Sequence, residues 1–99
     1  MIVHIVMFKF KVENRVKNLK MVEERLNSLV EKIDVLKFME VGVDFNGSER
    51  AFDLSLYSTF ETIEDLKAYD VHEEHLEVVK LIKEVTTESK VVDYVRTLV

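Results

Sequence analysis

The chain has 99 residues, of which 47% are hydrophobic and 33% are charged, and its net charge is −5. This composition is typical of one folded domain, residues 1–99, and it excludes an intrinsically disordered chain. Lysines and glutamates are interleaved without a basic cluster, so we do not expect nucleic acid as a partner.

The chain contains no cysteine, which excludes disulfides, thiolate metal sites and a cysteine nucleophile. Its longest apolar run, residues 3–8, is interrupted by His4. This run is too short for a signal peptide or a membrane-spanning helix. We therefore expect a cytoplasmic protein that does not bind membranes.

Residues 2–12 are rich in β-branched and aromatic side chains, which predicts a strand. Side chains alternate along a strand, so one face should carry Ile2, His4, Val6, Phe8 and Phe10. The opposite face should carry Val3, Ile5 and Met7. Both faces are apolar, and a single layer of helices covers only one of them.

Residues 14–33 change to a helical period and predict an amphipathic helix of about five turns, with Asn14 as its N-cap. Its apolar side should carry Val16, Leu19, Val22, Leu26, Leu29, Val30 and Ile33. Two further strands, residues 36–45 and about 50–59, should form a hairpin. Asn46-Gly47 favours a turn between them, because both residues tolerate positive φ.

Thr62 and Asp65 resemble a capping box, which predicts a short helix that contains Tyr69. A break near residues 70–72 should follow, where Asp70 or His72 can cap a second helix that runs to about residue 86. Residues 88–97 predict the last strand.

The predicted order βαββαβ is that of an α+β ferredoxin-like fold, with a four-stranded antiparallel sheet. Its helices would cover one face of the sheet and leave Val3, Ile5 and Met7 on the other. An exposed apolar sheet face favours self-association. We therefore expect a homodimer in which two sheets form a shared, barrel-like core.

The segment 66–76 holds a phenol and two of the three histidines of the chain. His75 falls on the apolar stripe of its helix and could act as a general base, while Tyr69 could donate a hydrogen bond to a developing oxyanion. The structural alternative is a hydrogen-bonded core histidine and a boundary tyrosine with a hydrated hydroxyl.

His4 and His72 are the other candidates. His72 and His75 share one helical face and, with His4, could hold a divalent metal. Two histidines at this spacing are a weak metal signal, so we expect neither a metal nor another cofactor. We interpret His72 as the cap at the helix break. His4 lies on the strand face towards the helices and needs a polar partner, either in a structural pair or in a binding site.

The first strand with its early histidine, and the pattern Tyr69-x-x-His72-x-x-His75, resemble the stress-responsive A/B barrel (Dabb) family over essentially the whole chain. The resemblance implies a dimeric α+β barrel. A cyclase of this family closes a linear polyketide by an aldol reaction in a pocket between helices and sheet. Its catalytic tyrosine and histidine match Tyr69 and His75, and a pocket histidine on its first strand matches His4.

We thus expect a Dabb domain homodimer with a small apolar ligand pocket in each subunit and an activity that the sequence does not specify. The pocket would bind a small organic ligand, such as a carbonyl compound, next to Tyr69 and His75. Its lining residues would be His4, Val6, Phe8, Val22, Leu26 and His72. One alternative is a cyclase-like or lyase-like enzyme that uses Tyr69 and His75 for acid–base chemistry. Others are a purely structural dimer and, more distantly, a cofactor-free monooxygenase or isomerase.

Overall fold

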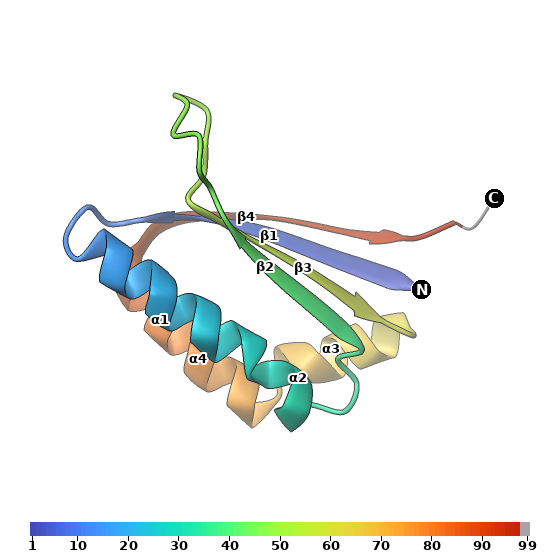
Figure 1. The fold of residues 1–99 in the computed structure, drawn as a ribbon. Helices are drawn as coiled ribbons and strands as arrows, with labels where there is room; N and C mark the ends of the chain where they lie inside the picture. Colours follow the sequence, from blue (N-terminus) through green and yellow to red (C-terminus); the bar gives the residue numbers. More distant parts are fainter. Residues whose placement is uncertain (98–99) are drawn as a thin grey trace.

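A four-stranded antiparallel sheet carries all the helices on one face (Figure 1). The computed structural model describes residues 1–97. Its elements are β1 (Ile2–Phe10), α1 (Arg15–Asn27), α2 (Leu29–Lys32), β2 (Phe38–Val43), β3 (Leu54–Phe60), α3 (Ile63–Asp70), α4 (Glu73–Val85) and β4 (Thr86–Val95). The strand order is β2-β3-β1-β4, which confirms the ferredoxin-like α+β fold.

β1 is a central strand, paired with β3 on one side and with β4 on the other. In this register His4 lies opposite Ser58 of β3 and opposite Asp93 of β4. The register of β1 and β4 shifts between Lys9 and Phe10, near the beginning of β4.

The predicted helix 14–33 is wrong in its extent, because the structure divides it at Ser28. The Ser28 hydroxyl donates a hydrogen bond of 2.7 Å to the carbonyl of Arg25, an acceptor that a continuous helix would use for the next turn. Asn14 does precede the helix, but its φ of 54° is left-handed and its side chain makes no capping bond. Val16 is 83% exposed, so the core-facing side of α1 begins at the partly buried Leu19 and continues with the buried Val22 and Leu26.

The hairpin strands are shorter than predicted, and their connection, residues 44–53, is longer. Gly47 has the expected positive φ of 64°, and its N–H donates to the Asp44 carboxylate. The Asp53 carboxylate accepts from the N–H of Phe10, which ties the end of this connection to β1. Phe45, predicted to continue the strand, lies in the connection and is 98% exposed.

The helix break before residue 73 is as predicted. Thr62 caps α3 by accepting from the N–H of Asp65 at 3.1 Å. His72 caps α4, because its Nδ1 accepts from the N–H of Glu74 at 3.1 Å. These two N-caps fix where α3 and α4 begin, and thereby help to position Tyr69 and His75.

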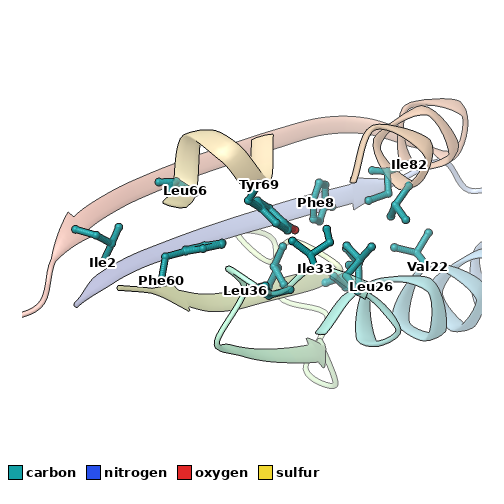
Figure 2. Packing of buried hydrophobic residues seen from close by; sticks show 14 of the residues in the cluster. Ile2, Phe8, Val22, Leu26, Ile33, Leu36, Phe60, Leu66, Tyr69 and Ile82 are labelled. Carbon is teal, nitrogen blue, oxygen red and sulfur yellow. The ribbon is translucent and has the colours of Figure 1, made fainter. Parts of the chain in front are cut away.

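The hydrophobic core lies between the sheet and the helices (Figure 2). β1 contributes Ile2, Phe8 and Phe10 to it, and the helices contribute residues such as Leu26 and Tyr69. On the opposite sheet face Val3 is buried, but Met7 is 40% exposed. Further large exposed side chains on that face, assigned by the strand register, are Phe38, Val92 and Tyr94.

Candidate ligand pocket

A cavity of about 210 Å³ lies between the sheet and α4. Four predicted pocket residues line it together with the two predicted catalytic residues, namely His4, Val6, Phe8, Leu26, Tyr69 and His75. The remaining lining residues are Leu56, Val78, Val79, Ile82, Lys83, Thr86 and Ser89. Most of the wall is therefore aliphatic or aromatic, with a few polar side chains.

Two residues expected in the lining are not part of it. Val22 is fully buried in the core, where α1 packs beneath the sheet. His72 uses its Nδ1 to cap α4, so this nitrogen faces the backbone of its own helix. His72 thus acts at the helix break, as the interpretation of a capping residue predicted.

Tyr69 is completely buried at the end of α3. Its hydroxyl finds no hydrogen-bond partner within residues 1–97. In Figure 2 the ring extends from α3 with its hydroxyl oxygen towards Phe8, another lining residue of the cavity. Burial raises the pKa of this hydroxyl above its ordinary value, and the negative charge of Asp70 adds to the rise. Tyr69 is therefore a protonated hydrogen-bond donor at neutral pH.

His75 lies in the first turn of α4, with its ring centroid 4.2 Å from that of Tyr69. Its Nδ1 is 3.1 Å from the carbonyl oxygen of Asp70. A carbonyl can only accept, so Nδ1 is the donor, and in the neutral ring Nε2 keeps its lone pair.

Burial lowers the pKa of His75 below its ordinary value. The hydrogen bond to Asp70 and the charge of that residue oppose the fall, while His4 and His72 add to it. The imidazole is therefore neutral at pH 7. A neutral ring with a lone pair on Nε2 has the protonation state that a general base requires.

His4 completes the polar end of the cavity. Its ring lies edge-on to Tyr69, with centroids 6.3 Å apart, and edge-on to Phe60 at 6.4 Å. The polar partner that His4 needs is the carboxylate of Asp93 on β4, which contacts its Nδ1. This carboxylate orients the imidazole and leaves Nε2 as its other polar atom.

Asp93 was not predicted from the sequence as a residue of the site. Period two in the last strand puts it on the same face as Val91 and Val95, and a carboxylate on an apolar strand face is a signal that could have identified it. Lys83, Thr86 and Ser89 were missed as well, because they lie where α4 passes into β4 and no motif marks them.

Within residues 1–97, no three His, Asp or Glu side chains are arranged to hold a metal ion. Over the same residues, no helix has both the length and the apolar character needed to cross a bilayer.

The model of the stress responsive A/B barrel domain matches residues 2–96. The chain belongs to this family. No curated protein matches the sequence. The family and the βαββαβ topology together confirm the resemblance inferred from the first strand and from the Tyr-x-x-His-x-x-His segment.

Solved structures of similar proteins agree with this assignment. A dimeric protein of unknown function and ferredoxin-like fold from Bacteroides fragilis is 33% identical, with a TM-score of 0.86, over 94% of this chain and 93% of its own. A protein from Arabidopsis thaliana is 23% identical, with a TM-score of 0.87, over 100% of this chain and 98% of its own. A hydroxynitrile lyase from Passiflora edulis is 21% identical, with a TM-score of 0.86, over 97% and 93%. The last two likenesses concern the A/B barrel fold alone.

Proposed function

We propose that this A/B barrel domain protein is a cytoplasmic homodimer, each subunit of which binds a small organic ligand in the cavity between sheet and α4. The observation that carries the proposal is the Tyr69 hydroxyl, which is buried beside His75 without a partner in residues 1–97. Burying a polar group without a hydrogen bond costs about 1–3 kcal/mol. A ligand with an acceptor atom would remove that cost on binding.

The cavity indicates the class of ligand. A cavity of about 150 Å³ lined by aliphatic and aromatic side chains binds benzene, so about 210 Å³ suits a molecule somewhat larger than one aromatic ring. Its walls are mainly apolar, whereas Tyr69 donates a hydrogen bond. A carbonyl compound with an apolar body combines these properties, with its oxygen accepting from Tyr69.

The homodimer is supported by the sheet face that the helices leave open. Met7, Phe38, Val92 and Tyr94 expose large apolar surface there. The relative from Bacteroides fragilis, which is 33% identical, is described as dimeric. Packing of two such faces would remove this surface from water, which is the main favourable contribution in most protein association.

Acetophenone, an aromatic ketone of suitable size, provides the test. We expect it to bind the purified protein and to shift the amide resonances of residues around Tyr69 and His75 in NMR titrations. Tyr69→Phe should weaken binding about two- to tenfold, as expected for one lost hydrogen bond. The matched control is Tyr57→Phe, which removes a phenol on the open sheet face and should leave the affinity unchanged. Absence of binding at millimolar ketone would contradict the pocket and favour a purely structural dimer.

A second candidate function, acid–base catalysis on a carbonyl substrate, is favoured by the state of His75. Its Nδ1 donates to the Asp70 carbonyl, so Nε2 can take a proton from the carbon next to a substrate carbonyl. The electron pair of that C–H bond moves towards the carbonyl oxygen, which becomes an enolate oxygen held by the Tyr69 hydroxyl. The Nε2–H of the imidazolium then exchanges with a deuteron of D₂O, and return of this deuteron to the carbon completes an exchange reaction.

Deuterium uptake into the methyl group of acetophenone in D₂O tests this chemistry. We expect the protein to accelerate uptake, and both Tyr69→Phe and His75→Gln to reduce the acceleration. Glu77→Gln is the matched control, because Glu77 is exposed on the same helix and does not line the cavity. If the wild-type protein binds acetophenone without accelerating exchange, the pocket binds this ligand but does not catalyse this proton transfer.

A further inference from the structure

The cavity extends along two elements in parallel. On α4 its wall includes His75, Val79 and Lys83, which recur every four residues and therefore share one helical face. The first and last of them are about 12 Å apart along the helix axis, at 1.5 Å per residue. On β1 the wall runs from His4 to Phe8, about 13 Å at the rise of a strand. Both elements thus give the cavity two separate ends.

The two ends differ in exposure. At one end Tyr69 is fully buried, and the imidazoles of His4 and His75 lie around it. At the other end Lys83 and Ser89 are exposed. Phe8 lies opposite Ser89 in the strand register, as His4 lies opposite Asp93 at the buried end. A ligand therefore has one end in an interior site and the other at a wet opening.

Lys83 is the cation of the open end. Within residues 1–97, no carboxylate forms an ion pair with it. The acidic side chain of Glu88, near this end, is paired with Lys90 at 3.4 Å. The Thr86 hydroxyl donates to the carbonyl of Ile82, so Lys83 and Ser89 are the side chains that can donate to a ligand there. A lysine stem can follow apolar wall while its ammonium stays in water.

We infer that the ligand is a short oxo acid, with a ketone or aldehyde oxygen at Tyr69 and a carboxylate at Lys83, joined by an apolar body along Val79. This inference rests on the proposed ligand-binding function and adds the chemical class of the ligand. One ammonium balances one carboxylate charge, and the walls between the two ends are apolar. The carbonyl group of the ligand lies at the interior end of the cavity. A carboxylate placed there would lose its hydration far from Lys83.

The probes are 6-oxoheptanoate and its methyl ester, which differ only in the charged end. Isothermal titration calorimetry of the purified protein should give about three- to tenfold tighter binding of the acid at low salt. The difference should shrink as the salt concentration rises, because Lys83 is exposed to solvent. Lys83→Met keeps the length of the stem and should bring the two affinities together. The matched control is Lys80→Met, on the same helix but outside the lining, which should leave the difference intact.

The outcomes separate this inference from the function on which it rests. The oxo-acid assignment is wrong if acetophenone binds but 6-oxoheptanoate binds no more tightly than its ester. It is also wrong if Lys83→Met leaves the difference between these two affinities unchanged. In both cases the proposal of a ligand-binding pocket is unaffected. If neither acetophenone nor either heptanoate probe binds, the ligand-binding function itself is contradicted. Tyr69→Phe should weaken the binding of the acid and of the ester by the same factor, because both probes present the same ketone to the Tyr69 hydroxyl.

Discussion

The imidazole of His4 and the carboxylate of Asp93 contact each other across β1 and β4, at directly opposed positions of the strand register. The contact is made through Nδ1 of the ring. Because an ionised carboxylate only accepts hydrogen bonds, Nδ1 must carry the proton. The interior end of the cavity therefore presents two imidazoles whose orientation is set by their Nδ1 atoms, His4 by a side chain and His75 by a backbone carbonyl.

Replacement of Asp93 tests this orientation. In the wild-type protein we expect ¹⁵N NMR of the imidazole to show His4 protonated at Nδ1. Asp93→Ala should remove that preference and weaken acetophenone binding severalfold, because the ring is no longer held. Asp93→Asn retains an acceptor oxygen and should keep most of the affinity. An Asp93→Ala protein with an unchanged His4 spectrum would show that the carboxylate does not orient the ring.

Removal of the Tyr69 hydroxyl should not destabilise the fold. The hydroxyl is buried without a partner in residues 1–97, so Tyr69→Phe deletes an unsatisfied polar group and keeps the aromatic ring. We expect the free energy of unfolding in urea to stay equal or to rise by up to about 1 kcal/mol, measured at one fixed protein concentration. A loss of more than about 1 kcal/mol would indicate a structural hydrogen bond and contradict a hydroxyl reserved for a ligand.

Acid should destabilise the protein through His75. Burial lowers its folded pKa below the ordinary value of about 6.5 in the unfolded chain, so between these two values the unfolded state binds more protons. The free energy of unfolding should therefore fall as the pH drops from 7.5 through 6.5 and should stop falling below the folded pKa. Urea unfolding at pH 7.5 and pH 5 should show a smaller fall for His75→Gln than for wild type. If the free energy of unfolding falls equally in wild type and in His75→Gln, titratable groups other than His75 cause the acid destabilisation.

The open sheet face should control the oligomeric state. Val92 is 53% exposed in the subunit and lies opposite Ile5 on that face. Val92→Lys would place a charge between the two packed sheets, and light scattering should then find a monomer where wild type is a dimer. The control is Val71→Lys, at an exposed position between α3 and α4, which should remain a dimer. A dimeric Val92→Lys protein would place the interface on another surface.

The order of elements could be predicted because each depends on local periodicity. Alternation gave the strands, and spacing of three or four residues gave the helices. The ends of the helices and strands were less predictable where a side chain forms a hydrogen bond with the backbone of another residue. Asp53, which bonds to the N–H of Phe10, helps hold a connection far longer than the Asn46-Gly47 turn suggests. At the break, the Ser28 hydroxyl bonds back to the carbonyl of Arg25, a contact that the spacing of apolar residues does not reveal.

The same distinction applies to the site. Tyr69 and His75 are neighbours in sequence, and helical spacing with two capping signals was enough to predict that they lie together. Asp93 reaches His4 only through the register of β1 and β4, which local patterns do not determine. Lys83 resembles any charged residue of a helix until the cavity beside it is known.

The central position of β1 also governs when the site can form. His4 and Asp93 are 89 residues apart in sequence, and β1 needs β4 as well as β3 as a neighbour. During synthesis the first strand therefore leaves the ribosome long before one of its two partners exists. Such distant pairings slow folding, because a long loop must close before they form. Ligand binding at His4 should consequently appear only in the last stage of folding, when β4 has joined the sheet.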